Sequence, residues 1–248
     1  MDDMPDLVSH IVASKFELEH AGFTNEQVAT YITGRIAELS INGLKVVPII
    51  GGPASGKSTL TNLLIKELTE HGLKADSISA DDYNIGTREW RWQNEREAPL
   101  MLKDFELLNK HINDIKNLKN DTDMIAVPTY DQLTGLAIAV GQENYTHKIG
   151  KLDVLFVDGD FDPVEAPDLH IFINVPAETR MQTRINRDLK VRGQVDAKKV
   201  ANSFKSRHEK QYIPYTAPAI HRADIVLSVQ PKPDNWMYDI YRVKQYTS

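Results

Sequence analysis

The sequence feature that most constrains this chain is a glycine-rich segment between two apolar runs. Residues 51–58 read Gly-Gly-Pro-Ala-Ser-Gly-Lys-Ser. They follow the β-branched run at residues 46–50 and precede a stretch with leucines at positions 60, 63, 64 and 68. Glycine lets successive backbone N–H groups point into one concavity, and a helix that begins there adds the positive end of its dipole. The order strand, glycine loop and helix therefore predicts a phosphate-binding loop.

The residues of this loop have defined roles if a nucleoside triphosphate binds. Lys57 would reach the β and γ phosphates, and the hydroxyl of Ser58 would ligate Mg²⁺. The alternative is a glycine-rich turn that only begins a structural helix, and the agreement of strand, loop and helix argues against it. We expect the nucleotide to contact Gly51, Gly52, Pro53, Ala54, Ser55, Gly56, Lys57, Ser58 and Thr59.

Composition and charge exclude several classes of function. The 248 residues include no cysteine, which rules out disulfides, cysteine nucleophiles and thiolate metal sites. The net charge of −6 argues against nucleic acid or an anionic membrane as a partner. The N-terminus is acidic, and no apolar run approaches the roughly 18 residues of a membrane span. We therefore expect a cytoplasmic protein, and the sequence leaves open whether it forms a homo-oligomer.

Apolar runs alternate with helical patterns along most of the chain. Strands are expected at residues 45–50, 75–80, 124–128, 152–157, 170–175 and 224–229, and a small hairpin at residues 136–140 and 145–149. Helices are expected at residues 57–71, 105–118, 176–191 and 195–212. This alternation predicts an α/β fold whose mainly parallel sheet carries helices on both faces. Residues 84–103 show no clear period and are expected to form a long loop that closes over a substrate.

The first 43 residues are expected to form a helical extension that packs outside the domain at residues 44–248. Apolar residues from Leu7 to Phe16 recur at helical spacing. Thr24 and Gln27 have the spacing of a capping box, which predicts a second helix that ends near residue 43. A separate binding role for this extension is the second possibility.

Acidic residues follow several of the expected strands. Asp81 and Asp82 follow one strand, Asp131 a second, and Asp158 with Asp160 a third. The site of an open α/β sheet lies outside the carboxyl ends of its strands, so these carboxylates should converge near the phosphate loop. Phosphoryl transfer to a hydroxyl needs Mg²⁺ on the phosphates and a carboxylate for the hydroxyl proton, whereas a single such Asp could equally cap a helix.

The helix expected at residues 176–191 carries two stripes. Arg180, Arg184 and Arg187 fall on one stripe, and Met181, Ile185 and Leu189 fall on the other. A solvated charged face is the common outcome for such a pattern. Because the whole chain is acidic, we instead expect residues 177–193 to act as a basic lid that neutralises phosphoryl charge.

Together these segments resemble the phosphoribulokinase/uridine kinase family of P-loop kinases over residues 45–230. The Arg-Asp…Arg-Gly segment with the later Ala-Asp-Ile makes the resemblance specific, since many families share the phosphate loop alone. The matching stretches are residues 51–59, Ser-Ala-Asp-Asp-Tyr at 79–83, Pro-Thr-Tyr-Asp at 128–131, Val-Asp-Gly at 157–159, the arginines 180, 184, 187 and 192, Tyr-Ile-Pro at 212–214 and Ala-Asp-Ile at 223–225.

The resemblance implies a P-loop NTPase with a nucleoside-kinase-like three-layer fold and a helical lid. It further implies an ATP- and Mg²⁺-dependent kinase that acts on the hydroxyl of a small molecule. By this resemblance Asp81 is the catalytic base, supported by Lys57 and Arg187, and Asp158 with Ser58 organises the metal. The acceptor pocket would include Asp82, Tyr83, Tyr130 and Asp131, and Arg184 and Arg192 would contact the nucleotide.

The acceptor-recognition half departs from the family pattern. Gln132, Gly135 and Ala137 stand where uridine kinases have an aromatic residue, a histidine and an arginine, and the region around Trp90 replaces another family segment. Uridine or cytidine is therefore one candidate acceptor, and a sugar, glycerate or vitamin-type alcohol is another. A nucleotide-binding regulator without catalysis is a further hypothesis, and the lack of an Asn-Lys-x-Asp sequence argues against a GTPase switch.

Overall fold

A computed structural model describes residues 7–39, 43–94, 99–130, 147–190, 196–232 and 236–244. Within these residues the main sheet has seven strands in the order β1-β9-β8-β7-β2-β6-β3. The strands β2, β3, β6, β7 and β8 run parallel, and β9 pairs antiparallel with both β8 and β1. Their bounds are β1 (Phe16–Phe23), β2 (Lys45–Gly51), β3 (Ala75–Ser79), β6 (Val154–Gly159), β7 (Ile171–Asn174), β8 (Ile225–Pro231) and β9 (Trp236–Val243).

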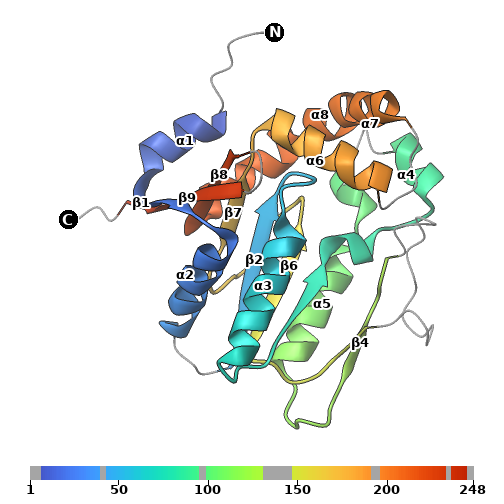
Figure 1. Cartoon of the computed structure of the whole chain (residues 1–248). Helices are drawn as coiled ribbons and strands as arrows, with labels where there is room; N and C mark the ends of the chain where they lie inside the picture. Colours follow the sequence, from blue (N-terminus) through green and yellow to red (C-terminus); the bar gives the residue numbers. More distant parts are fainter. Residues whose placement is uncertain are drawn as a thin grey trace.

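Helices cover both faces of this sheet and make a three-layer α/β fold (Figure 1). Because side chains alternate along β2, Val47 and Ile49 pack on one face with α2 (Asn25–Ala37) and α3 (Lys57–Glu70), whereas Val46 packs with α5 (Phe105–Lys116) on the other. The remaining helices are α1 (Leu7–Lys15), α4 (Arg88–Asn94), α6 (Ala177–Lys190), α7 (Ala197–Ser203) and α8 (Glu209–Gln211). None of the helices in the described part of the chain is long and apolar enough to cross a bilayer.

Pro48 lies inside the central strand without breaking its pairing. Val46, two residues earlier on the same edge, donates its N–H to the carboxylate of Asp168 (2.9 Å) and accepts the backbone N–H of that residue (2.9 Å). Pairing of β2 with β7 begins only at Ile49, opposite Ile171. The N–H that proline lacks therefore falls before the first ladder bond on this edge.

The expected strand at residues 124–128 belongs to a different sheet. Strand β4 (Ile125–Val127) pairs antiparallel with β5 (His147–Ile149) in a separate two-stranded sheet. An apolar run indicates a strand but not the strand with which it pairs. The sequence therefore could not show that this strand lies outside the main sheet. Of the expected hairpin, residues 136–140 and 145–146 lie outside the described residues, and its last residues, 147–149, form β5, which pairs with β4.

The N-terminal segment contributes a strand that the sequence pattern did not indicate. The helix α1 ends at Lys15, and Phe16, expected to be helical, is the buried first residue of β1. Residues 16–23 are mostly exposed and lack alternation, so no period-2 signal marks them as a strand. The expected capping box of α2 is confirmed: Thr24 accepts the N–H of Gln27, whose side chain accepts the N–H of Thr24.

The expected loop at residues 84–103 is partly helical. It contains α4 and a 3-10 turn at Pro99–Leu102, while residues 95–98 lie outside the described part. The loop returns to its own start, because Ile85 donates its N–H to the carbonyl of Leu102 (2.8 Å) and Asn84 forms a bridge with Lys103. This return brings Lys103 beside the residues that follow β3.

The capping box should contribute measurably to stability. Thr24→Ala removes the hydroxyl that accepts the Gln27 N–H, and we expect it to lower the free energy of unfolding by about 1 kcal/mol in urea titrations. Thr69→Ala is the matched control, because the Thr69 hydroxyl donates to the carbonyl of Ile65 in α3 and caps no N–H group. Equal losses in both variants would contradict a capping role.

Candidate active site

The phosphate loop connects β2 to α3 and is shaped from outside by two distant side chains. Gly56 adopts φ +85°, and the ring of Trp236 from β9 lies 2.9 Å from the position that a Cβ on Gly56 would take. A Cβ on Gly52 would lie 2.6 Å from a guanidinium nitrogen of Arg180. Both positions therefore require glycine, the first for backbone conformation and both for space. Ala54 also has a positive φ, +62°.

The ammonium of Lys57 is held across the mouth of this loop. Its Nζ donates to the carbonyls of Gly51 (2.9 Å) and Gly52 (3.0 Å) and to Asp160 Oδ1 (2.7 Å). Asp160 follows β6, so the contact joins the carboxyl ends of two neighbouring strands. The amine is thus fixed where the β and γ phosphates of a bound nucleotide would lie in such a loop.

One carboxylate faces the start of α3. Ser58 donates its hydroxyl to Asp158 Oδ2 at 2.8 Å, and Asp158 is buried. Two hard oxygen donors at this distance suit Mg²⁺, which keeps several waters and takes one or two protein ligands beside phosphate oxygens. Within the described ranges no three acidic or histidine residues are grouped so that they could hold a metal ion by themselves. Thr59 lies exposed in the same first turn, and Ser55 is buried within the loop.

The 3-10 turn Ala80–Tyr83 follows β3 and carries the second pair of acids. Asp82 accepts the backbone N–H groups of Tyr130 (2.8 Å) and Ser79 (3.3 Å). Burial raises the pKa of Asp82 to about 6, and these two N–H groups oppose the rise. Its carboxylate therefore ties two chain segments together, and its expected contact with the acceptor stays a prediction.

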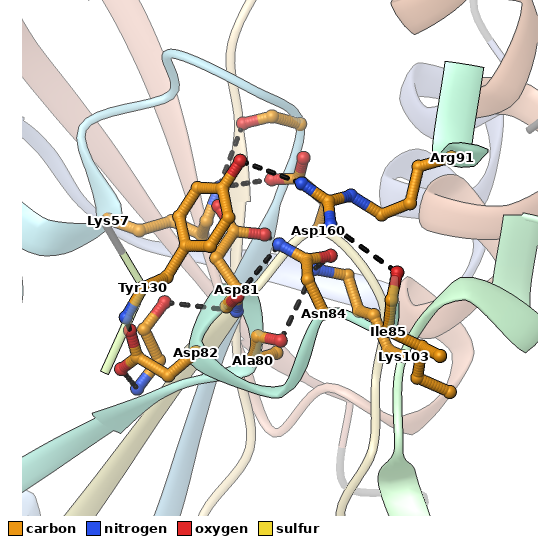
Figure 2. Close-up of polar contacts among 12 residues, drawn as sticks. Lys57, Ala80, Asp81, Asp82, Asn84, Ile85, Arg91, Lys103, Tyr130 and Asp160 are labelled. Atoms are coloured by element: carbon orange, nitrogen blue, oxygen red, sulfur yellow. Dashed lines mark hydrogen bonds and ion pairs between the residues drawn. The ribbon is translucent and has the colours of Figure 1, made fainter. Parts of the chain in front are cut away.

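Asp81, the neighbour of Asp82, faces the opposite way and is half exposed. Its Oδ1 accepts the ammonium of Lys103 at 2.5 Å. Figure 2 shows Asp81 between the Lys57–Asp160 pair on one side and the side chains of Asn84 and Lys103 on the other. A carboxylate in this position can take a proton from a group that approaches the phosphate loop.

Tyr130 is held beside this turn by an arginine that sequence reasoning missed. Arg91 of α4 donates to the Tyr130 hydroxyl (2.9 Å) and to the carbonyl of Gly86 (2.6 Å), and its guanidinium lies 5.3 Å from the centre of the Tyr130 ring. Arg91 is buried although it lies in the segment expected to form a long loop that closes over a substrate. In the sequence, the one feature that marks Arg91 is its position between Trp90 and Trp92.

Tyr83 does not line this site, which corrects the expectation that it contacts the acceptor. Its side chain is buried, and its hydroxyl lies 2.9 Å from Nδ1 of His111 on α5. The 3-10 turn points this residue into the core that β3 shares with α5. Asp131 and Arg192, expected in the acceptor pocket and in the lid, lie outside the described residues.

The arginines of α6 differ from the expected stripe. Arg180 is almost fully buried; it donates to the carbonyl of Val175 (3.0 Å), pairs with Glu209 (2.9 Å) and stacks 4.1 Å from the centre of the Tyr212 ring. It therefore anchors the start of the helix and cannot be part of a solvated or mobile lid face. The expected apolar stripe is also wrong, because Leu189 is exposed and the buried residues of α6 are Arg180 and Asp188.

The other two arginines lie further along the helix. Both form ion pairs with Asp188: Arg184 Nε lies 3.3 Å from its Oδ2, and Arg187 Nε lies 3.1 Å from its Oδ1. The charge of Asp160, which pairs with Lys57 of the phosphate loop, acts on Arg184. Figure 1 shows α6 and α7 over the end of the sheet where β2 and β6 stop.

The segment after α7 closes the same end of the sheet with two π-helical turns, Phe204–His208 and Tyr212–Thr216. Such turns break the regular helix and re-aim side chains. Burial, with the charges of Arg184 and Arg207, lowers the pKa of His208 to about 3, while Asp81 acts in the opposite sense. His208 is therefore neutral at pH 7 and lies within electrostatic reach of both Asp81 and Arg184.

Comparisons with known proteins agree with this geometry. The sequence profile described as Phosphoribulokinase / Uridine kinase family matches residues 46–235. A uridine kinase from Staphylococcus aureus (strain JH9) is 29% identical over 189 residues, which cover 73% of this chain and 86% of that protein.

Solved structures add the fold. A D-glycerate 3-kinase from Cryptococcus neoformans var. grubii aligns with a TM-score of 0.59 at 16% identity, over 83% of this chain and 94% of that one. Phosphoribulokinase from Rhodobacter spheroides aligns with a TM-score of 0.54 at 16% identity, over 77% and 72% of the two chains. At such identities the likeness shows the fold alone, and the sequence profile supplies the assignment: this chain belongs to the phosphoribulokinase/uridine kinase family of kinases.

Proposed function

We propose that this kinase transfers the γ-phosphoryl group of ATP to a hydroxyl of a small molecule, with Mg²⁺ as the metal. The observation that carries the proposal is the meeting of three adjacent strand ends. Strand β2 ends in the phosphate loop with Lys57, β6 ends at Asp158 and Asp160, and β3 ends beside Asp81. A phosphate site and a carboxylate that can accept a proton thus face each other across one edge.

In this proposal each residue has one task. The loop amides and Lys57 hold the β and γ phosphates, and Ser58 and Asp158 hold the metal, which when bound neutralises phosphate charge. Asp81 takes the acceptor proton while the acceptor oxygen bonds to the γ-phosphorus and the bond from that phosphorus to the ADP oxygen breaks. Arg184, Arg187 and the undescribed Arg192 would neutralise charge on the moving phosphoryl group.

The acceptor is a small alcohol, and two chemical groups of acceptor remain candidates. The S. aureus relative is named a uridine kinase, which supports uridine or cytidine. The departures at Gln132, Gly135 and Ala137 support a sugar, glycerate or vitamin-type alcohol instead. ADP release above the ATPase background, measured over a panel of both groups, decides between them. If none of the acceptors raises ADP release above that background, a nucleotide-binding regulator without catalysis is favoured.

Lys57 should be essential for transfer but not for folding. Its amine contacts the loop and Asp160 rather than the apolar core. Lys57→Ala should therefore abolish ADP formation with the best acceptor and keep the wild-type thermal unfolding temperature within a few degrees. Lys66→Ala, an exposed position on the same helix, is the control and should match wild type. Wild-type turnover in folded Lys57→Ala would refute the phosphate-loop assignment.

Substitutions of Asp81 and Asp158 should change different kinetic parameters. A general base contributes about 10²–10⁴-fold in rate, so Asp81→Asn should lower kcat by that factor and leave ATP affinity nearly unchanged. Asp158→Asn should instead raise the Mg²⁺ concentration needed for half activity, because a neutral amide holds a hydrated hard cation less well. Asp82→Asn should be milder in kcat than Asp81→Asn. A larger loss of kcat in Asp82→Asn than in Asp81→Asn would assign the role of general base to Asp82 instead.

The basic part of α6 should respond to nucleotide. We expect slower amide hydrogen exchange in Ala177–Lys190 when a non-hydrolysable ATP analogue and Mg²⁺ bind, since phosphate draws Arg184 and Arg187 toward the loop. The helix α5, which packs on the core, is the internal control and should exchange at the same rate in both states. Unchanged exchange in α6 with nucleotide and acceptor present would leave only a structural role for these arginines.

A further inference from the structure

Lys103 is a buried lysine that the proposed mechanism does not use. Its side chain is 7% exposed, and it lies between the 3-10 turn Pro99–Leu102 and the start of α5. Lysine is almost never buried without a partner, because its ammonium loses the water that solvates it. The groups that receive this ammonium therefore indicate what the residue does.

Within the described part of the chain, the ammonium of Lys103 contacts the turn that carries Asp81 and the residue that follows it. Lys103 Nζ donates to Asp81 Oδ1 (2.5 Å), to the carbonyl of Ala80 (3.3 Å) and to Asn84 Oδ1 (3.4 Å). An ammonium has three N–H donors, so these three oxygens can use all of them (Figure 2). Asn84 also donates its side-chain amide to the carbonyl of Asp81 at 2.7 Å, which closes the group on itself.

The backbone around Lys103 is fixed to the same turn. Ile85 donates its N–H to the carbonyl of Leu102 (2.8 Å), and Asp104 donates its N–H to the carbonyl of Tyr83 (2.9 Å). Lys103 itself forms the bridge with Asn84 between these two bonds. The side chain therefore starts from a fixed point and has little freedom to leave Asp81.

We propose that Lys103 is the positioning residue for Asp81: it holds one carboxylate oxygen so that the carboxylate faces the acceptor hydroxyl, and its charge favours the ionised form of that carboxylate. This inference rests on the proposed function, in which Asp81 takes the acceptor proton. In this proposal Lys103 acts through Asp81, which it contacts directly. A loss of Lys103 should then affect the proton transfer more than the binding of ATP.

The charges around Asp81 explain why such a cation is needed. Asp82 lies on the same turn, and its carboxylate disfavours a second negative charge there. His208 from the Phe204–His208 turn interacts electrostatically with Asp81 but is neutral at pH 7, because its pKa lies near 3. Lys103 places a positive charge in direct contact with Asp81. A cation at such a distance lowers the pKa of a carboxyl group by about 1–3 units.

Kinetics of three variants test the proposal. With the acceptor that the panel identifies, Lys103→Met should shift the acidic limb of the kcat–pH profile upward by about one pH unit. That shift makes kcat about tenfold lower on the limb, with KM for ATP changed less than about twofold. Lys103→Arg should restore most of kcat. Lys45→Met is the control, because Lys45 pairs with Asp168 (3.5 Å) at the start of β2, and its profile should match wild type.

A direct titration keeps the test independent of activity. Carboxyl carbon shifts of ¹³C-labelled aspartate, assigned to Asp81 with the Asp81→Asn variant, should report a higher pKa for Asp81 in Lys103→Met than in wild type. An unchanged pKa, or an unshifted kcat–pH profile in a folded variant, would overturn the role of Lys103. If wild-type protein turns over no acceptor while the pKa of Asp81 still depends on Lys103, the proposed function fails and the electrostatic pairing stands.

Discussion

The arrangement of the site depends on the parallel pairing of β2 between β6 and β7. Strand β2 is paired on both edges, so the chain leaves the sheet at the carboxyl end of β2 and forms the phosphate loop there. The carboxyl end of β6 lies beside it. The salt bridge between Lys57 and Asp160 and the hydrogen bond between Ser58 and Asp158 follow from this register. With β3 next to β6, the turn that bears Asp81 reaches the same edge without any long-range adjustment.

Features set by local chemistry could be predicted, and features set by distant partners could not. The loop, the helix α3 with Gly72 after its end, and the Thr24 capping box all depend on residues a few positions apart. The sheet assignment of β4, the edge strand β1 and the contacts of Arg91 and Lys103 depend on residues that meet only in the fold. A sequence pattern records which residues are apolar or charged but not their partners.

The helix α6 shows the same limit in a different way. Its spacing of arginines was read correctly, but the environment of each differs by position along the axis. Arg180 at the root is enclosed by Tyr212, Glu209 and the phosphate loop, whereas Arg187 two turns later is over a third exposed. A buried guanidinium is stable here because it stacks on a ring and pairs with a carboxylate. One stripe thus contains both a buried anchor, Arg180, and a partly exposed arginine, Arg187.

The contact between Trp236 and Gly56 gives the order of synthesis a consequence for the nucleotide site. The loop and β2 leave the ribosome long before β9, yet the indole that fills the space beside Gly56 belongs to β9. A partly synthesised chain can therefore form the strand and helix on either side of the loop while one wall of the loop is still missing. The docking of this late strand completes both the sheet and the wall of the loop.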